Sequence, residues 1–219
     1  MTWQLVITKY ILGVAGLIFA NNVFAANLTL NFVDQYGAPL SNTVVEHVNA
    51  NSVTIQDNLS ILEMDQVDKQ FSPVLLIAQQ GQQVNFPNSD NIRHHVYSFS
   101  PTKPFQLKLY SGQPEKPITF DNEGIVVLGC NIHDSMVGYI YVSKNKHVYQ
   151  SDEQGRIELK NVTLPVQLSA WNPLQKATLE EKKIISLAIN TPNNIQLSLQ
   201  TADPAPRNTF GNKFKGRND

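Results

Sequence analysis

The sequence predicts an all-β protein in which many short strands form β-sandwich structure. Apolar and polar residues alternate over short segments, as at Leu28, Leu30 and Phe32, and a period of two is typical of strands with one buried face. Turn-forming residues separate these segments at regular intervals, for example in residues 34–40, and this spacing favours a sandwich. The 219 residues are enough for one or two domains with a core.

The predicted strands run from residue 28 to about residue 200. A first hairpin joins residues 28–32 to 43–48, and two strands lie on either side of Gly81. Further strands are predicted at 94–100, 117–120, 124–130 and 136–142, within 148–173, and at 182–189 and 194–200. Residues 50–72 fit either a short helix or an irregular connection.

The charge composition argues against nucleic-acid binding. The chain has 17 basic and 18 acidic residues, a formal net charge of −1, and only 16% charged residues in total. Nucleic-acid binding depends on an excess of basic charge. We therefore expect no nucleic-acid partner.

Residues 1–25 are typical of a secretory signal peptide. Lys9 precedes an apolar stretch from Ile11 to Ala20, and Val23-Phe24-Ala25 fits the small-x-small rule for cleavage. The alternative is an uncleaved anchor, but the apolar stretch is shorter than the ~20 residues that span a bilayer. We expect a periplasmic protein with no transmembrane span in the mature chain. Residues 202–219, rich in Pro, Gly and basic residues, are predicted to form a flexible tail.

Cys130 is the only cysteine in the chain, although exported proteins usually pair their cysteines. His133 and Met136 follow it in a tight loop between two predicted strands. One cysteine cannot build a cysteine-rich zinc site or an iron–sulfur cluster, whereas two histidines, a cysteine and a weak axial methionine bind blue copper. A buried thiol and a core methionine are the alternative reading, and the joint spacing favours copper.

The second histidine is expected from a distant strand, where His94 and His95 are both available. This part of the sequence resembles the cupredoxins, such as plastocyanin, pseudoazurin and amicyanin. The family has an asparagine, five residues, the first ligand histidine, one residue and a valine, which Asn88, His94 and Val96 match. The two-residue gap between His133 and Met136 has the amicyanin length.

The resemblance covers about residues 60–143 and implies a Greek-key cupredoxin β-sandwich. It also implies one type 1 copper ion bound by His94, Cys130, His133 and Met136. Backbone N–H groups near Asn88 and Asn131 are expected to donate to the Cys130 sulfur. His95 stands where most cupredoxins have an asparagine that braces the cysteine loop, and its imidazole is a candidate for that bracing.

The function that the resemblance implies is one-electron transfer. His133 is expected to reach the surface through an apolar patch, with Ile92, Ile132 and Val137 as candidate patch residues. The partner is expected to be a redox protein, a c-type cytochrome or a periplasmic dehydrogenase. The remaining histidines, including His47 and His147 at predicted surface strand ends, are too few for further copper centres. The sequence therefore predicts a carrier and not an enzyme.

The flanks carry a second resemblance. Residues 26–59 and 144–201 resemble carboxypeptidase-regulatory-like domains, which are small Ig-like β modules. The hypothesis is that the cupredoxin part is inserted into this module, and the alternative is that residues 26–50 add strands to the cupredoxin. The whole layout resembles bacterial chains labelled methylamine-utilisation proteins.

Two other functions stay open at this point. One is copper binding and trafficking with the same ligands. The other is a β-sandwich partner-binding module in which copper is incidental.

Overall fold

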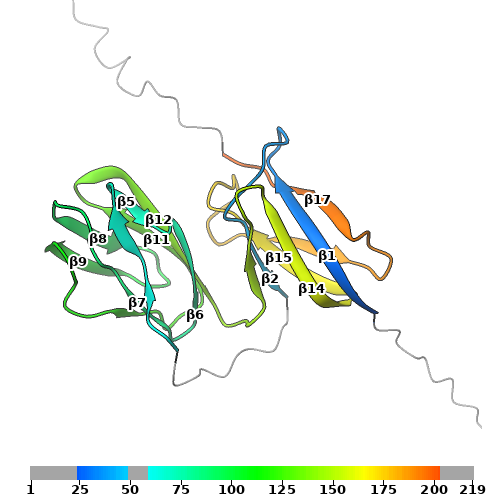
Figure 1. Cartoon of the computed structure of the whole chain (residues 1–219), viewed down its shortest axis with the longest axis horizontal. Coiled ribbons are helices and arrows are strands. Elements are labelled where there is room, and N and C mark those ends of the chain that lie inside the picture. Colours follow the sequence, from blue (N-terminus) through cyan, green and yellow to red (C-terminus); the bar gives the residue numbers. More distant parts are fainter. Residues whose placement is uncertain (1–23, 49–58, 203–219) are drawn as a thin grey trace, which may run out of the picture.

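The computed structural model describes residues 24–48 and 59–202, which form two lobes that lie side by side (Figure 1). We call strands β3–β12, from the middle of the sequence, the central lobe, and strands β1, β2 and β13–β17 the flanking lobe. Every regular element in these residues is a strand. The all-β prediction is therefore confirmed.

The strands of the central lobe are short, apart from the two that carry the cysteine loop. They are β3 (Leu62–Glu63), β4 (Asp65–Val67), β5 (Gln70–Ser72), β6 (Leu75–Gln79), β7 (Gln83–Asn85), β8 (His94–Ser98), β9 (Phe105–Tyr110), β10 (Ile118–Thr119), β11 (Gly124–Cys130) and β12 (His133–Ser143). Residues 59–72 thus form strands and connections, and the short-helix alternative is wrong for them.

The flanking lobe combines strands that precede and strands that follow the central lobe in the sequence. They are β1 (Phe24–Val33), β2 (Val44–His47), β13 (Val148–Gln150), β14 (Arg156–Leu164), β15 (Val166–Trp171), β16 (Lys183–Leu187) and β17 (Asn194–Ser198).

Each lobe buries a core of its own between sheets. In the central lobe, a five-stranded sheet in the order β6-β12-β11-β8-β9 packs with the β10-β7-β3 sheet, and their shared core includes Val84, Val96 and Leu128. In the flanking lobe, the sheets β14-β1-β17 and β13-β2-β15-β16 enclose Leu30 and Leu168. The alternation of apolar residues in the sequence supplies these inward-facing side chains.

A third apolar cluster joins the two lobes. Val44 and Trp171 of the flanking lobe pack with Leu75, Ile125 and Tyr141 of the central lobe, and all five are buried. The Trp171 ring lies 5.8 Å from the ring of Tyr141. The lobes are therefore in apolar contact.

A buried carboxylate strengthens this junction. Glu46 of β2 accepts hydrogen bonds from the hydroxyls of Tyr141 (2.8 Å) and Ser143 (2.7 Å) of β12. Lys182 Nζ donates to the same carboxylate at 2.6 Å and lies 4.6 Å from the centre of the Tyr141 ring. A buried charge is tolerated when it is paired and hydrogen-bonded in this way.

Some sequence predictions lie outside the described residues, namely residues 1–23 of the predicted signal peptide and 203–219 of the predicted tail. Strand β1 begins at Phe24, two residues before the expected mature start. Within the described residues there is no helix of a length and apolarity that would cross a bilayer. The predicted domain limits, and the assignment of the flanks to a separate module, stay predictions.

Candidate metal centre

Three adjacent strands bring the candidate donor residues to one end of the central sheet. Strand β11 runs antiparallel to both β8 and β12, so its last residue, Cys130, lies near the start of each of them. Cys130 pairs with His133 after a register shift that follows Gly129, and it pairs with Val96 beside His94. Sheet pairing thereby brings together His94 and Cys130, which are 36 positions apart in the sequence.

The donor atoms converge within this end of the sheet. Cys130 Sγ lies 3.5 Å from His94 Nδ1 and 3.8 Å from His133 Nδ1, and one donor atom from each residue lies within 4.8 Å of the others. The imidazole centres of His94 and His133 are 5.0 Å apart. His94 and Cys130 are buried and His133 is partly exposed.

These separations fit a single metal ion. Protein metal–sulfur and metal–nitrogen bonds of about 2.3 and 2.0 Å, at angles between about 109° and 120°, place sulfur and nitrogen about 3.5–3.7 Å apart. The two observed Sγ–Nδ1 distances, 3.5 and 3.8 Å, lie close to this range. The donor set therefore fits a soft transition-metal ion without rearrangement of the backbone.

Asp90 fixes the orientation of the His94 ring. Its Oδ2 lies 2.7 Å from His94 Nε2, and the N–H groups of Asp68 and Lys69 donate to its carboxylate at 2.7 and 2.9 Å. Burial raises the pKa of Asp90, but the hydrogen bonds from Lys69, His94 and Asp68 bring it below its ordinary value. Because an ionised carboxylate only accepts, His94 Nε2 carries the proton and Nδ1 offers its lone pair.

Sequence reasoning missed Asp90. The available signal was a carboxylate four residues before His94 in a polar loop. What places it is the turn at Asp68 and Lys69, which both have positive φ. That turn is more than 20 residues away in the sequence.

Met136 lies in the same core cluster as Cys130 and is 1% exposed. It follows His133 on β12. Met64, which the sequence did not single out, is also buried in this cluster. The structure thus brings together His94, Cys130 and His133, and it places Met136 in the core cluster that also contains Cys130.

The backbone N–H groups of Asn88 and Asn131 both have carbonyl partners. The backbone N–H of Asn88 donates to the carbonyl of Gly112 at 2.7 Å, and that of Asn131 donates to the carbonyl of His95 at 3.2 Å. Both N–H groups therefore have carbonyl partners, and the expected donation to the Cys130 sulfur from backbone groups near these residues stays a prediction. Asn88 also braces the loop before His94 through its side-chain amide, which donates to the carbonyls of Ile92 and Tyr110 at 2.9 Å each.

His95 braces the cysteine loop with its backbone and not with its ring. Its carbonyl accepts the Asn131 N–H, whereas its Nε2 is buried without a hydrogen-bond partner among the described residues. The expected imidazole bracing is therefore replaced by a main-chain contact.

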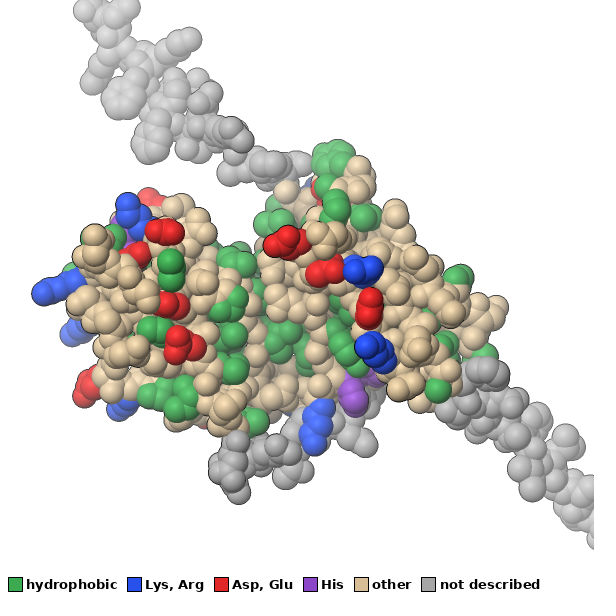
Figure 2. All heavy atoms as spheres, in the orientation of Figure 1, with side chains coloured by type: hydrophobic (Ala, Val, Ile, Leu, Met, Phe, Trp, Pro, Cys, Tyr) green, Lys and Arg blue, Asp and Glu red, His purple; other side chains and the backbone are tan. Residues whose placement is uncertain are grey.

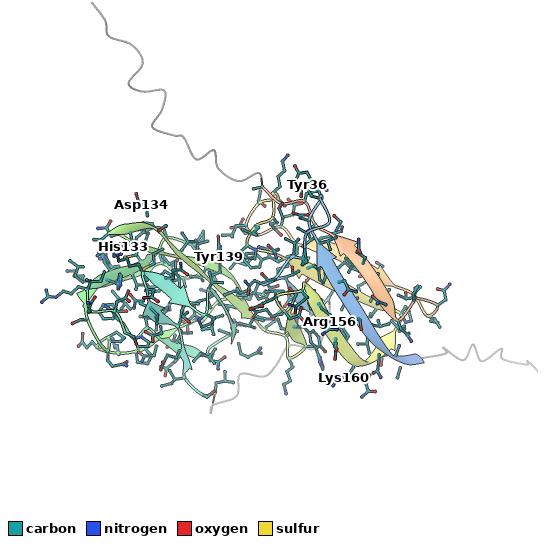
Figure 3. All side chains as sticks on the ribbon, turned by 45° about the horizontal axis from the view of Figure 1, so that its top comes forward. Tyr36, His133, Asp134, Tyr139, Arg156 and Lys160 are labelled. Atoms are coloured by element: carbon teal, nitrogen blue, oxygen red, sulfur yellow. The ribbon has the colours of Figure 1, made fainter. Side chains whose placement is uncertain are left out.

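An apolar surface lies beside the cluster. Ile132 and Val137 are exposed by 48% and 38%, and Ile92 is partly exposed. Val137 also lines a shallow hollow with Tyr97 and Phe99, which the sequence did not single out. Figure 3 shows His133 toward the outer end of the central lobe and Tyr139 of the same strand toward the flanking lobe. Ile132 directly precedes His133, whereas the hollow at Val137 reaches toward the flanking lobe, because Leu179 also lines it.

Comparison with known proteins gives similarity to solved structures. No family model matches the chain, and no curated protein matches it. A copper-containing nitrite reductase from Thermus scotoductus is 24% identical over 45% of this chain and 25% of its own, with a TM-score of 0.37. This chain therefore corresponds to about a quarter of that reductase.

Two smaller copper proteins are also similar. An oxidised amicyanin variant is 21% identical over 38% of this chain and 82% of its own, with a TM-score of 0.34. A pseudoazurin from Sinorhizobium meliloti is 21% identical over 39% of this chain and 75% of its own, with a TM-score of 0.30. These structures are cupredoxins, and the all-β fold of this chain is consistent with a cupredoxin-like sandwich. The resemblance of the flanks to carboxypeptidase-regulatory-like domains stays a prediction.

The expectation that the chain is not an enzyme is corrected by these similarities. One of the similar structures is a nitrite reductase, which is an enzyme, while others are amicyanins and a pseudoazurin. Similarity to solved structures therefore does not exclude catalysis.

Proposed function

We propose that this chain is a periplasmic copper protein that transfers one electron at a time between redox partners. The observation that carries the proposal is the convergence of Cys130 Sγ with His94 Nδ1 and His133 Nδ1 at 3.5 and 3.8 Å. A thiolate and two imidazoles, with a thioether close by, form the ligand set of blue copper sites. When bound, copper supplies a one-electron couple.

The residues of this chain hold the donors in place. Cys130 would supply a thiolate to the copper ion, His94 and His133 would supply imidazole nitrogens, and Met136 would supply a thioether. Asp90 holds the His94 ring at Nε2, and sheet pairing fixes the three strand ends. A site fixed by the fold changes little between two oxidation states, so little reorganisation accompanies electron transfer.

The partner surface is proposed to be the apolar area around His133. Ile92, Ile132 and Val137 would contact a c-type cytochrome or a periplasmic dehydrogenase, and His133 would be the exit point of the electron. Transient redox contacts of this kind bury less than about 1,200 Å². The exposed Phe99, with 83% of its surface accessible, would extend this contact area.

The visible spectrum after addition of Cu(II) to the purified protein tests the ligand set. We expect an intense thiolate-to-copper charge-transfer band that is lost in Cys130→Ser. The adjacent histidines provide a matched pair of variants: His94→Gln is expected to abolish the band and His95→Gln to preserve it. A folded wild-type protein that shows no such band contradicts the proposal.

A second measurement separates electron transfer from copper trafficking. An electron carrier keeps its copper in the presence of a Cu(I) chelator and exchanges electrons rapidly with a small redox reagent. Rapid release of Cu(I) to the chelator, with slow electron exchange, would instead favour trafficking.

A further inference from the structure

Two histidines of the flanking lobe lie together, away from the strands of the candidate metal centre. His47 ends β2, and His147 directly precedes β13. These strands pair antiparallel with Val148 opposite Glu46, which sets His147 opposite His47. The His47 N–H donates to the His147 carbonyl at 3.4 Å. The pair is thus built by sheet register between residues 100 positions apart in the sequence.

The two rings are spaced like those of the candidate metal centre. Their centres are 5.3 Å apart with an interplanar angle of 45°, against 5.0 Å and 56° for His94 and His133. A metal ion that binds one nitrogen of each ring at about 2.0 Å lies about 3.2 Å from each ring centre, so a tetrahedral angle separates the centres by about 5.2 Å. The spacing of His47 and His147 therefore fits a shared ion.

A buried nitrogen also lacks a partner at this place. His47 Nε2 is buried without a hydrogen-bond partner among the described residues, which is costly for a polar atom. The carbonyl of His47 accepts a bond from Asn145 Nδ2 at 3.1 Å, which helps to fix the strand end. Burial, together with the charge of His147, lowers the pKa of His47, so the neutral imidazole that binds metals is the favoured form.

A surface hollow borders the pair, although His47 Nε2 itself is buried. His147 is exposed and His47 is partly exposed, and both line a hollow with Tyr149, Lys160 and Thr163. Figure 2 shows histidine surface at the lower edge of the flanking lobe. Lys160 is exposed and lies toward the lower end of that lobe (Figure 3), so its ammonium can extend into solvent.

We propose that His47 and His147 form a second metal site, for a divalent first-row transition ion such as Zn(II) or Cu(II). Two imidazoles would occupy two coordination positions, and water would occupy the others. Imidazole donors suit Zn(II) and Cu(II), and the general affinity order places Cu(II) above Zn(II). The site is independent of the proposed copper centre, since it shares no residue with it.

Calorimetric titration of the full chain with Zn(II) tests the site by counting equivalents. We expect wild type to bind one more equivalent than His47→Gln or His147→Gln. Because His147 is exposed, its replacement keeps the fold, which far-ultraviolet circular dichroism checks. Lys160→Gln is the matched control, since it alters the same hollow and removes a repelling charge. It is expected to keep the extra equivalent and to bind it more tightly.

The measured quantity is the difference in bound Zn(II) equivalents between wild type and variant, so it does not depend on what His94, Cys130 and His133 bind. Equal numbers of equivalents in wild type and in folded His147→Gln would overturn the proposal. The proposal would also be overturned if the hollow bound inorganic phosphate and not Zn(II), and if Lys160→Gln weakened that phosphate binding. That result would make the hollow an anion site.

Discussion

Two regions of the molecule, one in each lobe, use buried polar groups in different ways. In the flanking lobe, buried side chains such as Thr43, Ser151 and Asn172 are hydrogen-bonded to nearby backbone: Thr43 and Ser151 donate to the Leu40 carbonyl, and Asn172 donates to the Ser41 carbonyl. In the central lobe, Cys130 Sγ and His94 Nδ1 face each other across 3.5 Å in an apolar core. Buried groups that complete turns are structural, whereas donors that converge without completing a turn indicate a ligand site.

The junction between the lobes follows the structural pattern. Trp171 is fully buried there, and its indole N–H donates to the Leu179 carbonyl at 2.9 Å. The Glu46 carboxylate is satisfied by groups from both lobes. None of these residues contributes to the cluster of His94, Cys130 and His133. The comparison therefore separates residues that determine stability from residues that determine the site.

Replacement of Trp171 by alanine is expected to have the largest effect on stability. Loss of a buried tryptophan costs about 3–5 kcal/mol, and here the loss also opens the apolar contact between lobes. Denaturant unfolding measures the change in the free energy of unfolding, followed by far-ultraviolet circular dichroism so that the signal does not depend on tryptophan. The thiolate–copper band is expected to persist. Tyr36→Ala is the control, because Tyr36 is 79% exposed and its loss should cost less than about 0.5 kcal/mol. Loss of the band in folded Trp171→Ala would contradict the proposal that the residues of the junction determine stability and not the metal site.

Glu46→Gln tests the polar half of the same junction. Burial raises the pKa of Glu46, but hydrogen bonds from Lys182, Ser143 and Tyr141, and the charge of Lys182, lower it below its ordinary value. The substitution leaves Lys182 without its carboxylate and weakens the bonds from β12. We expect the free energy of unfolding near neutral pH to fall by about 1–3 kcal/mol.

The pH dependence of the free energy of unfolding tests whether the ionised Glu46 carboxylate stabilises the fold. A carboxyl whose pKa is lower in the folded state stabilises the protein above its unfolded pKa of about 4.3, and this contribution is lost as the pH falls through the folded value. Wild type should therefore lose stability below about pH 5 more steeply than Glu46→Gln. The exposed Glu158 provides the control variant Glu158→Gln. Equal slopes for wild type and Glu46→Gln would show that the carboxylate does not stabilise the junction.

The sequence predicted local features of the molecule better than long-range ones. Alternating apolar residues predicted the strands, because period two follows from strand geometry itself. Cys130, His133 and Met136 could be grouped because they share one loop. His94 required the resemblance to a family, since the pairing of β8 with β11 is not visible in the local sequence.

Side-chain contacts across the fold could not be predicted in this way. Asp90 reaches His94 only because the Asp68–Lys69 turn holds its carboxylate. The burial of the His47 imidazole nitrogen depends on the register of β2 with β13, and the sequence predicted only a surface residue there. The backbone N–H groups of Asn88 and Asn131 likewise donate to carbonyls of Gly112 and His95, and the local sequence does not reveal these contacts.

Met136→Leu is expected to have the smallest effect on stability and a clear effect on the site. Leucine nearly conserves the buried volume, so the apoprotein should lose less than about 1.5 kcal/mol. If Met136 is the axial ligand, loss of the thioether removes a donor that matters more to Cu(II) than to Cu(I), and the reduction potential should rise. Spectroelectrochemistry measures the potential, and Met64→Leu is the matched control because Met64 is buried in the same core cluster. An unchanged potential in Met136→Leu would reduce Met136 to a packing residue and leave the three converging donors as the whole of the proposed site.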